Sequence, residues 1–288
     1  MIYNYVEFLK GGFLVRKINY KMIVSDFDGT LVQGDGNVSE KNIKAINEYI
    51  DAGGIFVIST GRVPSAILSR ARELGLKGLI SCCQGTIILD IESGNMLFDQ
   101  RLPEKTTVDA CREMEKLGLH IHAYDLWEYY SNIDDEMLRY YQDITETKAN
   151  LVLNEKLSDF ISKKGLGAYK LLAMVLPEDN AKIVAKLKEA NIPDCDITKS
   201  AKFLVEIVND KCSKGSAVSF LAKHYGIEIE KTVGIGDNYN DISMIETVGL
   251  GVAVANAEDA LKQRAGYVCE NSNEQSAIAE VIEKFGFC

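Results

Sequence analysis

The stretch VSDFDGTLV, residues 24–32, places two aspartates one residue apart at the end of an apolar run. The run itself begins at residue 22 and is typical of a buried strand. Because strand side chains alternate between faces, we expect Asp26 and Asp28 to leave the strand on the same side. Two carboxylates so close together repel each other unless a cation lies between them. The stretch predicts either a metal site or a nucleophile with an acid or base beside it. An ordinary Asp-Gly turn near a helix cap is the alternative.

The bulk composition is that of an ordinary globular protein. Of the 288 residues, 47% are hydrophobic and 26% are charged, which fits one large or two medium domains. The formal net charge of −10 offers no broad positive surface for nucleic acid. No apolar run approaches the roughly 18 residues needed to span a bilayer. We therefore expect neither a nucleic acid nor a membrane partner, and any anionic substrate needs a local positive charge in its site.

The cysteines and the N-terminal residues bear on location and chain organisation. The seven cysteines follow no zinc-binding spacing and are an odd number, which predicts unpaired thiols in a reducing cytoplasm. Residues 1–21 lack the features of a signal peptide and precede the first strand, so they are predicted to be an N-terminal extension. Either an early start codon or a short packed arm explains them. We expect a monomer or a small homo-oligomer.

From residue 22 onward, short apolar runs alternate with helical periodicity. A helix is predicted to begin after the N-cap residue Ser39, and strands are predicted at residues 55–58 and 79–82. A second helix is expected between these two strands, over residues 66–74. This βαβαβ order predicts an α/β fold with a doubly wound parallel sheet, similar to the Rossmann architecture.

The middle of the chain follows a different pattern. Residues 103–208 combine antiparallel strands with helices, which predicts an inserted α+β cap domain. The helix predicted at residues 214–225 and the strand at 232–236 resume the first pattern. Residues 22–102 and 209–288 are therefore predicted to form one catalytic core.

Polar residues follow several of the predicted core strands. In an open α/β sheet, ligands bind beyond the carboxyl ends of the strands. Thr60 and Gly61 follow the strand at 55–58, close to a helix start that suits an anion. Lys214 opens a helix, where its charge opposes the helix dipole, so a ligand explains its position better. The strand at 232–236 is followed by Asp237, Asn240 and Asp241.

This combination of side chains suits phosphoryl transfer through an enzyme carboxylate. Attack by a carboxylate and hydrolysis of the resulting acyl phosphate divide a slow reaction into two easier steps. A magnesium ion would cancel the repulsion between carboxylate and phosphate. A second acid is needed to protonate the leaving oxygen and then to activate water.

The strings DFDGT, STGR, SKGSAV and GDNYND resemble, in the same order, the four motifs of the haloacid dehalogenase superfamily of phosphohydrolases. Their placement is most similar to the Cof-type phosphatases, which carry a large α/β cap between the second and third motifs. The resemblance covers residues 22–288. It implies that Asp26 is the nucleophile and that Asp28 is the acid/base. Because dehalogenases of the superfamily lack the second aspartate, Asp28 argues against dehalogenation.

The resemblance also implies two sets of ligand-binding residues. Mg²⁺ would be bound by Asp26, the backbone carbonyl of Asp28, Asp237 and a supporting Asp241. Phosphate would be held by Phe27, Thr60, Gly61, Lys214 and Asn240.

Four further residues are predicted to line the substrate pocket. Gln84 precedes a glycine where the family usually has Asn-Gly. His120 and His122 share a face of a predicted cap strand, although a solvated or cap-sheet face would give the same pattern. Arg62 could reach the substrate or tie the cap to the core.

Together, these features predict a Mg²⁺-dependent phosphatase that acts on a small phosphorylated metabolite through an aspartyl-phosphate intermediate. Sugar phosphates, pyridoxal phosphate and flavin mononucleotide are the substrate classes of similar proteins. A phosphomutase of the same superfamily, or a catalytically weak regulatory protein that binds a phosphorylated ligand, are the alternatives.

Overall fold

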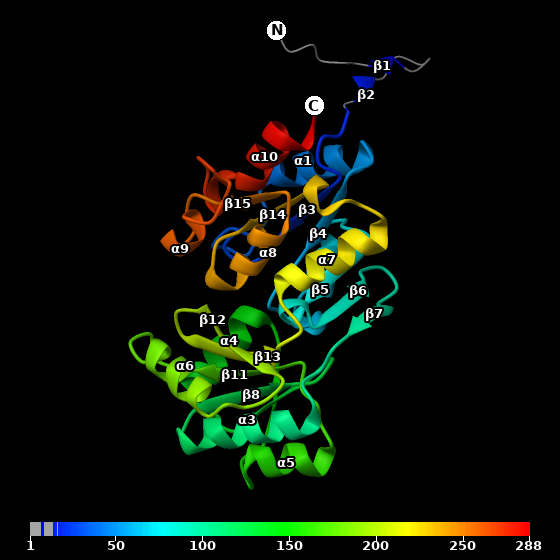
Figure 1. Ribbon diagram of the computed structural model, residues 1–288. Helices are drawn as coiled ribbons and strands as arrows, with labels where there is room; N and C mark the ends of the chain where they lie inside the picture. The colour runs from blue at the N-terminus through cyan, green and yellow to red at the C-terminus, as the bar shows by residue number, and fades with distance from the viewer. Residues whose placement is uncertain (1–6, 9–13, 16) are drawn as a thin grey trace. The chain divides into compact units, whose positions relative to one another are not determined.

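The computed structural model describes residues 7–8, 14–15 and 17–288 (Figure 1). The chain forms two compact units. Unit 1 contains the described residues up to Thr60 together with Lys214–Cys288, and unit 2 is Gly61–Ser213. The sequence placed the domain boundaries near residues 102 and 209, whereas residues 61–102 group with unit 2 here. The functional division into core and cap stays a prediction.

Unit 1 is built on a parallel sheet. Its strands are β3 (Met22–Ser25), β4 (Ile55–Ile58), β14 (Thr232–Gly236), β15 (Leu250–Ala253) and β16 (Tyr267–Val268). Within the described residues the strand order is β16-β15-β14-β3-β4, and every neighbouring pair is parallel. The longest helices of this unit are α1 (Glu40–Asp51), α7 (Lys214–Tyr225) and α8 (Ile242–Thr247). Since helices connect parallel strands, this confirms the α/β doubly wound class.

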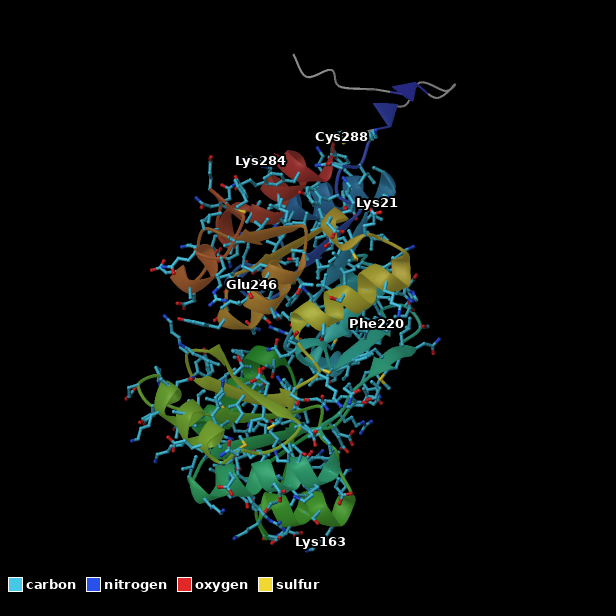
Figure 2. The ribbon with its side chains drawn as sticks, viewed as in Figure 1. Lys21, Lys163, Phe220, Glu246, Lys284 and Cys288 are labelled. Atoms are coloured by element: carbon cyan, nitrogen blue, oxygen red, sulfur yellow. The ribbon has the colours of Figure 1, made fainter. Side chains whose placement is uncertain are left out.

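Two groups of helices cover this sheet. Helix α8 packs on β14 and β15 and against α7, while α1 packs on β4 and against α10 (Ala277–Val281) (Figure 1). In Figure 2, the labelled Phe220 and Glu246 mark α7 and α8. Helix α1 begins where the sequence predicted, because the Ser39 Oγ accepts a 3.1 Å hydrogen bond from the Asn42 backbone N–H.

Short helical segments complete unit 1. They are α9 (Asp259–Lys262), η3 (Ile229–Lys231), η4 (Tyr239–Asp241), η5 (Asn273–Gln275) and η6 (Ile282–Gly286). In the part of the chain that the structure describes, no helix combines the length and the apolar character needed to cross a membrane.

The first part of unit 2 contains an antiparallel sheet of β5 (Leu79–Cys82), β6 (Ile87–Asp90) and β7 (Met96–Asp99). The prediction that residues 79–82 form a third parallel strand is therefore wrong. The turn η2 (Cys83–Gly85) has three successive positive φ angles, of 49°, 59° and 94°, and it reverses the chain so that β5 pairs with β6. A buried apolar run does not specify its neighbour. The elements η1 (Pro64–Ala66) and α2 (Leu68–Glu73) precede β5.

A mixed sheet forms the rest of unit 2. Its strands are β8 (His120–Tyr124), β9 (Tyr129–Ser131), β10 (Ala149–Leu151), β11 (Lys170–Met174), β12 (Cys195–Ala201) and β13 (Leu204–Asn209). Their order among the described strands is β10-β9-β8-β11-β13-β12. The helices are α3 (Glu104–Lys116), α4 (Glu136–Thr145), α5 (Leu157–Lys164) and α6 (Asn180–Glu189). The sequence predicted an α+β insertion here but not β10, which lies in a polar stretch.

The two faces of this mixed sheet differ in character. One face is apolar and contributes Ile121, Leu171 and Ile207 to a core shared with α3 and α5, which lie side by side (Figure 1). The opposite face carries buried polar residues instead: His120, His122, Tyr124, Tyr129, Ser131, Lys170 and Glu206. A buried polar face requires hydrogen-bond partners throughout.

Part of the predicted N-terminal extension is packed. The backbone N–H of Cys288 donates to the Lys17 carbonyl at 2.8 Å, and that of Asn19 donates to the Gly286 carbonyl at 3.0 Å. Lys21 and Cys288 are both labelled in Figure 2. Further upstream, β1 (Glu7–Phe8) pairs with β2 (Leu14–Val15). Residues 17–21 thus fit the packed-arm interpretation, and the remainder of that prediction lies largely outside the described residues.

Candidate active site

Asp26 lies directly after β3, at the carboxyl edge of the parallel sheet. Its backbone N–H donates to the Ile235 carbonyl at 2.9 Å, which extends the pairing of β3 with β14. The Asp26 side chain is only 5% exposed. Asp28 lies two residues further on, beyond the end of β3, and is exposed. The two aspartates of the opening motif are therefore in different environments, one buried and one open to solvent.

Three carboxylates come together at this edge. Asp26, Asp237 and Asp241 each offer an oxygen within 4.8 Å of the others. The turn after Asp26 approaches Asp237 closely: a Cβ on Gly29, whose φ is +78°, would lie 2.7 Å from the Asp237 Oδ2. Thr30 Oγ1 donates to the Asp237 Oδ1 at 2.8 Å. Only glycine fits position 29, because both the space and the backbone conformation exclude a side chain.

Lys214 connects two of these carboxylates. It is the first residue of α7, as predicted, and its side chain is fully buried. The Lys214 Nζ lies 2.6 Å from the Oδ1 of Asp26 and 2.6 Å from the Oδ1 of Asp241. The other oxygen of Asp241 accepts the backbone N–H groups of Asp237 and Asn238, both at 3.0 Å. Asp241 therefore orients Lys214 and the loop after β14 at the same time.

The protonation equilibria of these groups reflect their crowding. Burial raises the pKa of Asp26 well above its ordinary value of 3.8, and repulsion from Asp241 raises it further. Burial also raises the pKa of Asp237 to about 6, again with a contribution from Asp241. Burial alone would lower the pKa of Lys214, but the Asp241 and Asp26 carboxylates raise it above its usual range. The Lys214 ammonium therefore pairs with two of three carboxylates that repel each other.

This arrangement fits a hard divalent metal ion. The donors are carboxylate oxygens, which hard divalent cations prefer over nitrogen or sulfur donors. The excess of negative charge over the Lys214 ammonium is what a divalent cation would neutralise. Asp26 and Asp237 would hold such an ion directly, with Asp241 beside them. The backbone-carbonyl role of Asp28 stays a prediction.

Four of the five predicted phosphate-binding residues belong to unit 1. Phe27 is buried beside Asp26, and Thr60 is buried two residues after the end of β4. Asn240 is half-buried in η4, on the loop after β14. Thr60 is the last residue of the first segment of unit 1, and Gly61 begins unit 2. The structure places Lys214 against Asp26, and the phosphate-binding roles of all five residues stay predictions.

The histidines predicted for the pocket are buried in unit 2. His122 is 0% exposed and His120 is 6% exposed, so the strand face is not solvated; a buried sheet face remains the alternative to a pocket role, which stays a prediction. Their Nε2 atoms lie 3.1 Å apart. His120 also contacts Ser131 and Asp135. Arg62 is half-buried, and its Nη1 donates to the Ala66 carbonyl at 3.4 Å.

Gln84 belongs to a buried network that includes two residues missed by sequence analysis. Its Nε2 donates to Glu206 Oε2 at 2.7 Å, and Lys170 Nζ donates to Glu206 Oε1 at 2.8 Å. Lys170 and Glu206 each stand as a single charge inside an apolar strand. A charge in an apolar strand is a signal that could have identified both residues, although not their pairing.

Comparison with known proteins agrees with this geometry. A sequence profile described as haloacid dehalogenase-like hydrolase matches residues 23–282. The chain belongs to the haloacid dehalogenase-like hydrolases. The family resemblance seen in the four motifs is therefore confirmed.

Several relatives of this hydrolase are similar over most of their length. The 5-amino-6-(5-phospho-D-ribitylamino)uracil phosphatase YwtE of Bacillus subtilis is 28% identical over 282 residues, which cover 92% of this chain and 97% of the relative. The HMP-PP phosphatase of Yersinia pseudotuberculosis is 26% identical, covering 85% and 87% of the two chains. A haloacid dehalogenase-like hydrolase from Bacteroides thetaiotaomicron has a solved structure with a TM-score of 0.79, 27% identity and coverage of 92% and 99%. The chain is accordingly an enzyme of the phosphoric monoester hydrolase class.

Proposed function

We propose that this enzyme is a Mg²⁺-dependent phosphatase that hydrolyses small phosphorylated metabolites through an aspartyl-phosphate at Asp26. The observation that supports this most directly is the buried cluster of Asp26, Asp237 and Asp241 around the Lys214 ammonium. A carboxylate so enclosed is a poor structural group, because burying several like charges is costly without a cation. It is a suitable nucleophile beside a cation and a phosphate.

The chemistry proceeds in two displacements. An oxygen of Asp26 forms a bond to phosphorus while the bond to the leaving oxygen breaks, and Asp28 donates a proton to that oxygen. Asp28 then takes a proton from water, whose oxygen attacks phosphorus and releases inorganic phosphate from Asp26. A bound magnesium ion would lower the repulsion between Asp26 and the phosphate. The exposure of Asp28 to solvent suits a group that exchanges protons with water.

The substrate is proposed only as a class. Two relatives of comparable similarity are named for different substrates, a phosphoribitylaminouracil and HMP-PP. Sugar phosphates, pyridoxal phosphate and flavin mononucleotide belong to the same range of small phosphate esters. The overall acidity of the chain means that selection among them depends on local groups rather than on its general charge.

A panel of phosphorylated metabolites tests the proposal through release of inorganic phosphate with Mg²⁺ and with a chelator. We expect release from at least one small ester, with loss of activity on chelation. Asp26→Asn should reduce turnover by far more than about tenfold, a change of 1.4 kcal/mol in the barrier. Asp51→Asn, an exposed substitution on α1, is the matched control and should behave as the parent.

Other results would contradict the proposal. Interconversion of phosphate isomers with little release would indicate a phosphomutase. Thermal stabilisation by phosphorylated ligands without turnover would indicate a regulatory binding protein. Turnover by Asp26→Asn within tenfold of the parent would place the nucleophile elsewhere.

We also infer a cytoplasmic location and a monomer or small homo-oligomer. All seven cysteines are free thiols, and five of them are buried, which suits a reducing compartment. Size-exclusion chromatography with light scattering would measure the oligomeric state.

A further inference from the structure

One carboxylate in unit 2 joins two side chains that both contact Gly61. Glu206 Oε1 accepts from Lys170 Nζ at 2.8 Å, and its Oε2 accepts from Gln84 Nε2 at 2.7 Å. The same Lys170 Nζ donates to the Gly61 carbonyl at 2.8 Å. We call these four residues, Gly61, Gln84, Lys170 and Glu206, the Glu206 network.

Gln84 restricts Gly61 from another direction. A Cβ built on Gly61 would lie 2.5 Å from Gln84 Nε2 and 3.2 Å from its Cδ. The Gln84 side chain is not free to withdraw, because it is 4% exposed and bonded to Glu206. Next along the chain, the Arg62 carbonyl accepts the Cys83 backbone N–H at 2.9 Å. The backbone at residues 61–62 is therefore held at several points by elements distant in sequence.

The ion pair at the centre of this network is unusual in its burial. The side chains of Lys170 and Glu206 are 4% and 3% exposed. Each lies on a strand whose alternate residues pack into the apolar core on the opposite face. A buried ion pair rarely increases stability over an apolar pair of the same size, but it does fix geometry. We therefore expect the Lys170–Glu206 pair to position the residues that it contacts, Gly61 and Gln84.

We propose that the Glu206 network is a positioning device for the phosphate-binding segment STGR, with Lys170 fixing the Gly61 carbonyl and Gln84 closing the space at its Cα. This inference rests on the proposed function, which assigns Thr60 and Gly61 to phosphate binding. Gly61 is joined to Thr60 through the peptide that carries its own N–H. Holding its carbonyl and its Cα therefore restricts the orientations open to that peptide, and with them the direction of the N–H.

This role makes a specific claim about substrates. The Lys170 ammonium is engaged with Glu206 and the Gly61 carbonyl and is also 4.8 Å from the Tyr124 ring. Lys170 therefore acts through Gly61, on the phosphate common to all substrates, rather than on the leaving group. Loss of the Lys170 ammonium should therefore lower kcat/KM for every phosphate ester by the same factor.

The test measures binding of inorganic phosphate to the full chain by calorimetry, with Mg²⁺ present. Hydrolysis of 4-nitrophenyl phosphate and of a hexose phosphate is measured in parallel. Lys170→Met should weaken phosphate binding by about tenfold or more, because a hydrogen bond from a charged donor is lost. It should lower kcat/KM for both esters equally. Lys170→Arg should recover part of the loss.

The matched control is Ile207→Ala, the next residue on β13, whose side chain lies in the apolar core on the opposite face. It should lower Tm while leaving phosphate binding within about twofold of the parent, well below the tenfold change expected above. Gln84→Met keeps the ion pair and removes only the amide. Gln84→Met should also weaken phosphate binding, and it replaces Lys170→Met in the test if that variant does not fold.

Two results would overturn the positioning role. The first is a folded Lys170→Met or Gln84→Met variant with the phosphate affinity of the parent. The second is a changed ratio between the two esters at unchanged phosphate affinity, which would place Lys170 on the leaving group. A parent that binds phosphate but hydrolyses no ester contradicts the proposed function instead, and the comparison of phosphate affinities still decides the role of the network.

Discussion

The two oxygens of the Asp241 carboxylate face donors of different kinds, the Lys214 ammonium on one side and two backbone N–H groups on the other. An asparagine could not replace it, since its amide nitrogen would face a donor on either side. Asp237 is different. Its Oδ1 accepts the Thr30 hydroxyl, and its charge adds to the repulsion in the cluster.

Asp237→Asn should therefore separate metal binding from folding. An asparagine can still accept from Thr30, and it removes one of three carboxylates that repel each other. We expect the Tm of the metal-free variant to equal or exceed that of the metal-free parent. In the parent, Mg²⁺ at 100 times its Kd should stabilise the fold by about 2.7 kcal/mol. The variant should lose this stabilisation, as measured by thermal unfolding with Mg²⁺ and with chelator.

Equal stabilisation of Asp237→Asn and the parent by Mg²⁺ would contradict the metal assignment. Asp51→Asn serves again as the control, because it removes a carboxylate far from the cluster in sequence and exposed on α1.

Gly61→Ala should be strongly impaired, and a second substitution should relieve it. The new methyl group would meet Gln84 Nε2 at 2.5 Å, closer than carbon and nitrogen approach without displacement. In Gly61→Ala/Gln84→Ala the obstructing atoms are gone. We expect the double variant to match Gln84→Ala alone in Tm and in phosphate affinity. Additive losses would mean that Gln84 does not limit the space at Gly61.

The sequence was most informative about which individual residues belong to the candidate site. Asp26, Lys214, Asp237 and Asp241 were recognised because charged side chains at strand ends or helix starts have few structural explanations, and the structure brings them together. The burial of Asp26 against the exposure of Asp28 was not predictable, because β3 ends at Ser25 and strand alternation does not continue beyond it. The Glu206 network required knowledge of which strands are neighbours.

At the scale of elements, β8 presents the two histidines of unit 2 to a buried polar layer. His122 is surrounded by Tyr124, Tyr129 and Tyr141, and it contacts His120 through the two Nε2 atoms. Burial lowers the pKa of His122 well below 6.5, and His120 and Lys170 lower it further. Burial also lowers the pKa of His120, against the opposing effect of Asp135.

These shifts predict a loss of stability on acidification. Because the folded pKa of His122 lies below the unfolded value, protons bind preferentially to the unfolded chain. The stability contributed by neutral His122 is complete above about pH 6.5 and decreases as the pH falls, by at most about 1.4 kcal/mol per pH unit. We expect the free energy of unfolding to fall less between pH 7.5 and 5.5 in His122→Phe than in the parent, as measured by urea titration.

The control for this experiment is His224→Phe, which removes an exposed histidine from α7. Its pH profile should run parallel to that of the parent. If His122→Phe also ran parallel to the parent, the buried His122 would not be the source of the pH dependence.

Element type was predicted better than element pairing. Helix α7 has the predicted limits, residues 214–225. Strand β5 was assigned to the wrong sheet, since nothing in residues 79–82 encodes the positive φ angles of Cys83 and Gln84 that follow. Strand β10 was missed because its side chains are largely exposed and show no apolar alternation.

At the scale of the whole chain, unit 2 is one continuous segment, whereas unit 1 is built from two parts that are distant in sequence. Unit 1 joins the residues before Gly61 to those after Ser213, so its sheet cannot form until both segments are present. Two residues that precede β3, Lys17 and Asn19, bond to Cys288 and Gly286. This pairing separates residues 17–21 from the rest of the predicted N-terminal extension.

Two truncations test that separation. A chain that starts with Met followed by Lys17 keeps every backbone bond between the arm and the C-terminal segment, and we expect its Tm and kcat/KM to equal those of the full chain. A chain that starts at Lys21 loses the bonds from Lys17 and Asn19 and the bridge between Ile18 and Phe287. At about 1 kcal/mol for each hydrogen bond, unfolding should require about 2–3 kcal/mol less free energy.

Chemical unfolding of the three proteins under one set of conditions measures the difference. The chain that starts with Met and Lys17 should fold and hydrolyse esters normally, because it keeps every bond described between residues 17–21 and the C-terminal residues. The longer one should keep the parent's kcat/KM at low temperature, since the motif residues begin at Asp26. It should lose activity at a lower temperature than the parent does, because residues 286–288 have lost their backbone hydrogen-bond partners. Equal destabilisation by both truncations would show that the stabilising contacts lie upstream of Lys17.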